Sequence, residues 1–321
     1  MRFTRVQAMF LVAALHILIP ALLVFWLWTG DFGSVTDWAA RILFVASYVL
    51  FIYLIGSWAF ASYYVRYALV LVFLAALLRS FFDLAGLPIV PETTPLFWIR
   101  NGILASGTIA LFRLSIKAVR ARHFDKESLN LSFPFEGGIH VVFEGGDGRM
   151  SPLMNYHYGS SVHGKSGVNN SMKYAVDITR LSAWGNDAYG FFPRVCPAYP
   201  VFNESVLSPC DGVIAGVADD LPNEEPWSGK GPYNLGNYVL LRTGDVYVLL
   251  GHLQKGSIRV KTGHPVKKGE LVARAGNSGW TSQPHLHIQA MGVAPDSFWK
   301  GEGIPITFDG RIPFKNKLFI K

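Results

Sequence analysis

The sequence predicts an all-α membrane domain followed by a mostly antiparallel β domain. Hydrophobic residues make up 50% of its 321 residues, and the long apolar segments all lie in the first third of the chain. After about Leu131 the pattern changes to short alternating runs separated by Gly, Pro, Asn and Asp, which is typical of strands and turns. We therefore expect a multi-span domain over residues 1–118, a basic linker over 119–130 and a β domain over 131–321.

Four apolar segments are candidate membrane spans, because about 20 apolar residues of helix cross a hydrocarbon core. They are Val6–Trp28, Ile42–Ala61, Tyr67–Leu87 and Leu96–Leu114. The first lacks a small-residue cleavage site and is expected to be a retained anchor. In the third, Arg79 and Asp83 are four residues apart and should pair on one helix face. Arg100 and Asn101 interrupt the fourth, so we expect three or four spans.

The net charge of +7 belongs mostly to the membrane half of the chain. Residues 1–128 contain 11 Lys and Arg against 6 Asp and Glu, whereas residues 129–321 contain 18 against 16. A basic cluster formed by Lys117, Arg120, Arg122 and Lys126 follows the last apolar segment. This distribution is explained by the tendency of Lys and Arg to flank membrane spans. We therefore expect the lipid bilayer as a partner and no nucleic-acid partner.

The strongest chemical signal is the segment Gln283-Pro-His-Leu-His-Ile288. Two histidines one residue apart on a strand project from the same face, and buried imidazoles without partners cost free energy. The pair His285 and His287 therefore indicates a metal site. Five further motifs precede it in order: Ser208-Pro-Cys-Asp-Gly-Val-Ile214, Gly236-Asn-Tyr-Val239, Gly251-His-Leu253, Gly263-His-Pro-Val-Lys-Lys-Gly269 and Gly276-Asn-Ser-Gly279.

This series resembles the M23 family of zinc metallopeptidases (lysostaphin-like, LytM-like), which cut the peptide part of bacterial cell walls. The resemblance covers roughly Asn155 to Ala290 and implies a β-sandwich of the duplicated hybrid motif type. It also implies that His287 binds Zn²⁺ and that His285 and His252 belong to the catalytic machinery. An aspartate four residues after a histidine would supply the remaining ligands.

The sequence departs from that family pattern at the first ligand. Asp177, in Lys173-Tyr-Ala-Val-Asp-Ile178, has Lys173 four positions before it, and a protonated ammonium cannot bind zinc. The site is then either inactive or completed by another histidine. Leu153–Tyr158 alternates as a strand would, placing Asn155 and His157 on one face, and His157 is the expected substitute. His163, in the following Gly- and Asn-rich stretch, is a weaker candidate.

Zinc in a catalytic site takes roughly three protein ligands and keeps one position for water. His157, Asp177 and His287 fit the ligand roles. His252 and His285 are left to orient the water, move a proton or stabilise an oxyanion, and the sequence leaves open which of them does which. Asn155 and Lys173 are candidates for contact with the substrate, with a solvated surface position as the alternative for Lys173. We expect His16, His123, His140 and His264 to be structural.

Two arguments about the side of the membrane conflict. Arg2, Arg5 and the basic cluster favour four crossings with both ends in the cytoplasm. A wall hydrolase must face outward, which requires three or five crossings or a fourth segment that lies in the interface. Cys196 and Cys210 permit one disulfide in an oxidising compartment, although two buried thiols explain them equally. We expect an extracytoplasmic β domain.

Within the β domain the expected strands are Gly138–Phe143, Gly236–Leu241, Val246–Leu250, Leu271–Ala275 and Leu286–Ala290, and residues 217–235 should form a loop over the groove. Three functions follow. The first is a membrane-anchored zinc endopeptidase acting on peptidoglycan cross-links or stem peptides. The second is a degenerate domain that binds wall peptide or regulates another hydrolase. The third is a peptidase acting on proteins at the cytoplasmic face.

Overall fold

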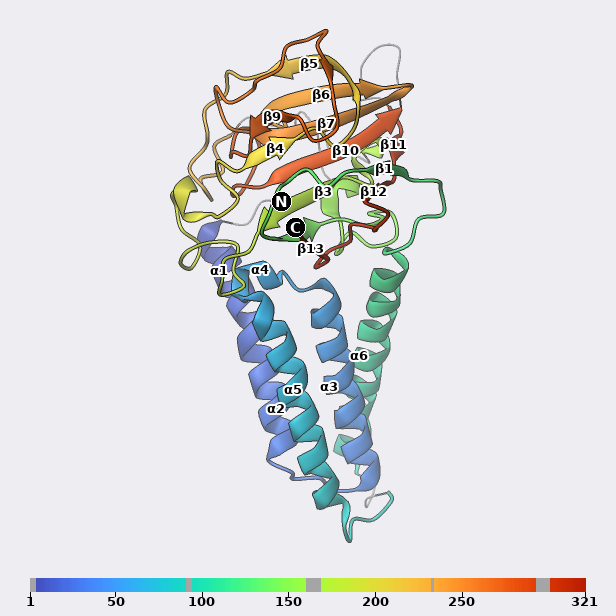
Figure 1. The fold of residues 1–321 in the computed structure, drawn as a ribbon. Helices are drawn as coiled ribbons and strands as arrows, with labels where there is room; N and C mark the ends of the chain where they lie inside the picture. The colour runs from blue at the N-terminus through green and yellow to red at the C-terminus, as the bar shows by residue number, and fades with distance from the viewer. Residues whose placement is uncertain (1–3, 91–93, 160–168, 232–233, 293–300) are drawn as a thin grey trace.

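The computed structural model describes residues 4–90, 94–159, 169–231, 234–292 and 301–321. Long helices form a bundle whose one end meets a β domain (Figure 1). The helices are α1 (Arg5–Ala13), which continues through a π-helical stretch (Ala14–Leu18) into α2 (Ile19–Trp28), α3 (Val35–Ile55), α4 (Trp58–Ala61), α5 (Tyr63–Ser80), which continues into a 3₁₀ turn (Phe81–Leu84), and α6 (Pro95–Arg120).

Four of these helical segments are long and apolar enough to cross a membrane: Arg5–Trp28, Val35–Ile55, Tyr63–Leu84 and Pro95–Arg120. The predicted boundaries of the second span were wrong, because its helix begins seven residues before Ile42 at Val35, with Ser34 as its N-cap, and ends at Ile55. The fourth segment is a full helix of 26 residues that packs along α3 and does not lie across the end of the bundle (Figure 1).

Ion pairs between and within helices explain how charged residues are accommodated in these segments. Arg100 at the start of α6 pairs with Asp37 of α3 at 2.6 Å, and Asp37 also pairs with Arg41 at 2.8 Å. The charge of Arg100, which interrupts the fourth apolar segment, is therefore neutralised by a residue of a neighbouring helix. The expected pair of Arg79 and Asp83 is confirmed at 2.7 Å.

The β domain is built on one nine-stranded antiparallel sheet with the order β13-β2-β3-β10-β7-β6-β5-β8, with β11 also paired to β10. Its strands are β2 (Ile139–Glu144), β3 (Val176–Arg180), β5 (Gly212–Ala218), β6 (Asn237–Thr243), β7 (Val246–Leu253), β8 (Pro265–Val266), β10 (Leu286–Gly292), β11 (Gly303–Ile304) and β13 (Leu318–Ile320). Two small sheets accompany it, a parallel pair of β1 (Leu129–Leu131) with β12 (Ile306–Phe308) and an antiparallel pair of β4 (Ser205–Leu207) with β9 (Leu271–Arg274).

The five strands expected from alternation are confirmed as β2, β6, β7, β9 and β10. The expected strand over Leu153–Tyr158 was wrong: this segment turns and then forms a 3₁₀ helix, Tyr156–Gly159. The reason is local, because the buried Asn155 amide donates to the carbonyls of Gly146 and Ala175 and so ties the segment to two separate loops. Between Asp219 and Gly236 the described residues contain only an isolated β-bridge, as expected for a loop.

The two faces of the large sheet have different environments. Apolar side chains such as Val176, Ile288 and Leu250 face a core that also includes residues of both small sheets. On the other side, near the β13–β2 edge, Val141 and Leu181 join the core of the helical bundle. The sheet therefore packs directly on the helix ends, with its β13 edge nearest to them (Figure 1).

Candidate metal centre

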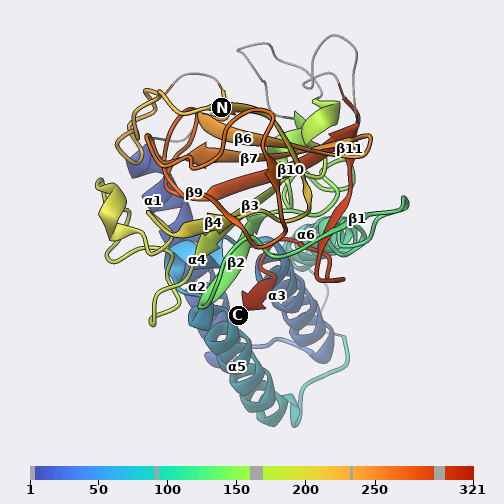
Figure 2. The ribbon, with the colours of Figure 1, turned by 45° about the horizontal axis from the view of Figure 1, so that its top comes forward.

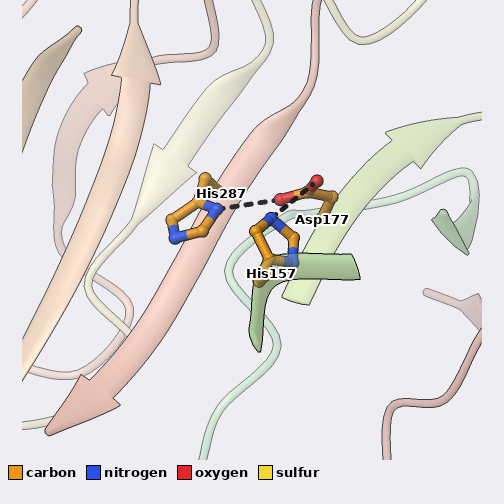
Figure 3. Close-up of side chains that lie close together, drawn as sticks. All are labelled: His157, Asp177 and His287. Carbon is orange, nitrogen blue, oxygen red and sulfur yellow. Dashed lines mark hydrogen bonds and ion pairs between the residues drawn. The ribbon is translucent and has the colours of Figure 1, made fainter. Parts of the chain in front are cut away.

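Asp177 and His287 face each other on neighbouring strands at the centre of the large sheet. The register of β3 and β10 pairs these two residues directly, although 110 positions separate them in the sequence. Their neighbours along the strands face the apolar core, so alternation projects both side chains from the opposite face. Asp177 Oδ1 lies 2.9 Å from His287 Nδ1 (Figure 3).

His157 joins this pair from the 3₁₀ helix. Its Nε2 lies 3.2 Å from Asp177 Oδ2, and its ring points toward the strand that carries His287 (Figure 3). The ligand atoms of the three buried residues all lie within 4.8 Å of one another. In a tetrahedral zinc site with bonds of about 2.0–2.1 Å, neighbouring ligand atoms are about 3.3 Å apart. The two measured contacts to Asp177 are close to that spacing, so the three residues form a possible metal site.

The far nitrogen of each imidazole is held by a side-chain amide oxygen. His157 Nδ1 donates to Asn155 Oδ1 at 2.7 Å, and His287 Nε2 donates to Gln289 Oε1 at 2.9 Å. The Asn155 NH₂ group is used by two backbone carbonyls, so its oxygen must face His157. Each ring therefore turns its other nitrogen toward Asp177, which is how metal-binding histidines are usually oriented. These residues fit a metal ion such as zinc.

His252 and His285 lie beside the three possible ligands. Their ring centroids are 4.7 Å apart, and His285 Nε2 is 3.6 Å from Asp177 Oδ2. His252 Nδ1 donates to the Ser278 carbonyl and His285 Nδ1 to the Gln283 carbonyl, each at 2.8 Å. Both rings therefore have Nδ1 committed to a backbone carbonyl, which leaves Nε2 as the other nitrogen available to a reacting group.

Backbone geometry places the His252 ring. His252 has φ of 59°, a left-handed conformation that is uncommon outside glycine. Its N–H donates to the Leu235 carbonyl at 2.7 Å and its carbonyl accepts from Gly276 N–H at 3.0 Å. These bonds on both sides hold the residue in its unusual conformation at the end of β7.

Charge in the centre is set by burial and by the histidines. Burial raises the pKa of the Asp177 carboxyl, but nearby His157 and His285, with hydrogen bonds from His157 and His287, outweigh it and hold the pKa well below its usual value. Burial lowers the pKa of His252 well below its usual value, and nearby His285 and His287 lower it further. At neutral pH the centre therefore contains an anionic carboxylate and a neutral His252.

Lys173 is not solvated. Its side chain is buried and its ammonium donates to Glu302 Oε1 at 2.7 Å, where Lys126 also donates at 2.8 Å. Hydrogen bonds from the two ammonium groups, and secondly their positive charges, lower the pKa of the Glu302 carboxyl to about 2. The surface interpretation of Lys173 was thus wrong, whereas contacts of Lys173 and Asn155 with a substrate stay predictions.

Sequence reasoning missed the residues that support the histidines. Gln289 follows His287 by two positions on the same strand face, so alternation alone could have indicated it. The second supporting residue is Asp187, whose Oδ2 accepts from Gln283 Nε2 at 2.5 Å. Gln283 lies two residues before His285. Burial raises the pKa of Asp187 to about 7. Nothing local in the sequence connects Asp187 with Gln283, because they are 96 residues apart.

The remaining candidates lie elsewhere. His163 falls outside the described residues. His140 is buried, where it pairs with Glu204 at 3.1 Å and stacks on Phe135. Cys196 and Cys210 are free thiols in this structure, and burial raises the pKa of each to about 11.

Comparison with known proteins finds a family match within the β domain. Residues 199–296 match the model of peptidase family M23. The match contains His252, His285 and His287 and begins after His157 and Asp177. It supports an M23 peptidase domain, and with it a metallopeptidase role, in this part of the chain.

The curated relatives match only short segments of this chain, and the matched segments are a small part of each relative's own length. A metalloprotease of Haemophilus influenzae, named as uncharacterized, is 39% identical over 85 residues, which are 26% of this chain and 15% of the relative. The peptidoglycan DD-endopeptidase ShyA of Vibrio cholerae is 38% identical over 58 residues, 18% of this chain and 13% of the relative. The catalytic domain of lysostaphin from Staphylococcus simulans is 23% identical, with 46% of this chain and 85% of that one aligned at a TM-score of 0.28.

Proposed function

We propose that this chain is a membrane-anchored zinc metalloendopeptidase, with peptides of peptidoglycan cross-links or stems as its first candidate substrate. The observation that carries the proposal is the convergence of His157, Asp177 and His287 within 4.8 Å, with His252 and His285 beside them. A binding module would not require five buried titratable side chains directed at one point, because each costs desolvation free energy. Hydrolysis explains why they are kept together.

When bound, zinc acts as a Lewis acid and lowers the pKa of a coordinated water to about 7. The chain's own residues provide the rest. His157, Asp177 and His287 would hold the ion, and Asn155 and Gln289 orient the two imidazoles. His252 is neutral with Nε2 unprotonated, so it can accept a proton there, and His285 has the same orientation. Once protonated, either ring becomes a donor that can stabilise an oxyanion.

The degenerate alternative rests on Lys173 at the position of the usual first ligand. Two features of the structure favour the active interpretation. The possible ligand set is complete with three other residues, and the Lys173 ammonium is turned to Glu302. Lys173 therefore neither occupies the metal position nor leaves it short of a ligand.

Removal and return of the metal is the direct test. We expect the zinc-loaded full-length protein in detergent to release soluble peptides from purified peptidoglycan sacculi, to stop in 1,10-phenanthroline and to recover with added zinc. Asp177→Ala is the inactive control. If zinc-loaded protein leaves sacculi intact but cleaves casein, the substrate is wrong. If it leaves both intact while still sedimenting with sacculi, the degenerate binding domain replaces the peptidase.

A second candidate, a peptidase acting on proteins at the cytoplasmic face, is favoured by the arrangement of the helices. Four long helices place Arg5 and the β domain at the same end of the bundle, together with Lys117 and Arg120 in the last turn of α6. At the opposite end Arg79 and Arg100 are neutralised by aspartates. Basic residues accumulate on the cytoplasmic side of membranes.

Reporter fusions distinguish the two sides. The peptidoglycan proposal requires alkaline phosphatase, which works only outside the cytoplasm, to be active when fused at Lys321. A fusion at Gly86, at the opposite end of the bundle, is the control and should be inactive. Should green fluorescent protein fluoresce at Lys321 while the phosphatase is silent, wall hydrolysis is excluded and the cytoplasmic peptidase replaces it.

A further inference from the structure

The loop between β3 and the 3₁₀ turn Cys196–Ala198 exposes large aromatic side chains to an unusual degree. Trp184 is 79% exposed, Tyr189 63% and Phe191 47%. Apolar side chains gathered on a surface mark a site of interaction. These residues define the aromatic loop, residues 182–192.

Hydrogen bonds fix the aromatic loop to the ends of the helices. The Gly185 carbonyl accepts from Tyr63 N–H and the Trp184 carbonyl from Ser62 Oγ, each at 2.7 Å. The Asp187 N–H donates to the Ala59 carbonyl at 3.0 Å. Figures 1 and 2 both show this yellow-green segment beside α4, at the level where the bundle begins. The loop therefore lies where the helical bundle meets the β domain.

The inner side of the aromatic loop is already filled. Phe192 is buried against Phe60 and Trp227, with ring centroids 5.1 and 4.9 Å apart. Arg5 at the start of α1 donates to the Phe192 carbonyl at 2.7 Å. Since these contacts hold the backbone from the inside, Phe191 and its exposed neighbours remain turned outward.

The helix surface next to the loop has the same character. Tyr64 and Tyr67, in the first turns of α5, are exposed, as are Val6 and Phe10 of α1. Tyrosine and tryptophan concentrate at the height of the lipid headgroups, where an amphipathic ring suits both environments. The exposed aromatics of the loop continue this band onto the β domain.

We propose that the aromatic loop rests in the lipid headgroup layer, with Trp184, Tyr189 and Phe191 as its lipid contacts. This inference rests on the proposed membrane anchoring. The proposal also bears on the position of the metal centre. The Gln283 side chain donates to Asp187 of the aromatic loop, and the Gln283 carbonyl accepts from His285 Nδ1. Two hydrogen bonds thus connect the aromatic loop to His285, so the loop places the centre close to the membrane surface. A substrate peptide must accordingly be reached near the bilayer surface.

Spin labels measure this directly. In a Cys196→Ser, Cys210→Ser background, the single variants Trp184→Cys and Tyr189→Cys are labelled with a nitroxide. The labelled proteins are placed in nanodiscs of phosphatidylethanolamine and phosphatidylglycerol at a 3:1 ratio. Power saturation with oxygen and with a water-soluble nickel chelate reports depth. Val213, exposed on β5 next to the edge strand farthest from β13, is the aqueous control, and Leu18, exposed at mid-span, is the lipid control.

We expect the oxygen-to-nickel accessibility ratio at Trp184 and Tyr189 to be several-fold above that at Val213 and below that at Leu18. A ratio equal to that at Val213, with Leu18 in lipid, overturns the loop proposal and leaves the aromatics for a substrate. A water-like ratio at Leu18 itself would instead overturn the membrane anchoring. Because the labelled side chains are exposed, their replacement should not disturb folding.

Discussion

Replacing His157 by alanine is expected to remove zinc from the protein as thoroughly as replacing Asp177 or His287. Each offers one of three possible ligand atoms within 4.8 Å, and two remaining ligands would hold zinc poorly. Metal content after dialysis, measured by mass spectrometry, should fall from about one zinc per chain to near zero in all three variants. Thermal unfolding with chelator present tests whether the metal-free fold itself survives the substitution.

Two matched variants make this result specific. Lys173→Ala should retain zinc, because the ammonium is directed at Glu302. Asn155→Ala should weaken zinc binding by about 10–100-fold or more, since Asn155 orients the His157 ring and also ties its segment to two loops. Full zinc occupancy in the His157 variant would show that this histidine is not a ligand and that another side chain completes the set.

Alanine at His252 or His285 is expected to leave zinc bound and to slow peptide cleavage by about a hundredfold to ten-thousandfold, the usual contribution of general acid–base catalysis. Both rings have Nδ1 committed to a backbone carbonyl, which leaves Nε2 as the nitrogen for proton transfer. Zinc stoichiometry and the cleavage rate, measured on the same preparation, separate metal binding from catalysis.

The controls for this second prediction take account of the backbone. His252 is left-handed, so His252→Asn should be compared with His252→Ala, because asparagine tolerates that conformation. His264→Ala, at an exposed turn, should change neither zinc content nor rate. If both the His252 and His285 variants lose zinc, these histidines are ligands and the assignment of roles must be reversed.

Local pattern was sufficient for much of the architecture. Alternation located β6, β7, β9 and β10, and hydropathy located the apolar helices, although it misplaced the bounds of the second and left the fourth uncertain. Both signals can be read from consecutive residues, because they depend only on the period of apolar side chains and on the length of an apolar run. The same alternation placed His285 and His287 on one face. The family resemblance supplied their expected roles, which the structure and the M23 match leave to be tested.

Contacts between distant segments were decided only by the tertiary structure. Asp177 meets His287 because β3 and β10 pair in one register, and a slip of one residue would turn one side chain to the core. Arg100 is neutralised by Asp37 of another helix, and Asn155 bends a segment whose alternation predicts a strand. Which nitrogen of each histidine faces the centre depends on Asn155, Gln289 and two backbone carbonyls. The sequence by itself thus determined which residues could bind a metal, whereas the pairing of strands over a hundred residues apart decided that they meet, because register depends on the packing of the whole sheet.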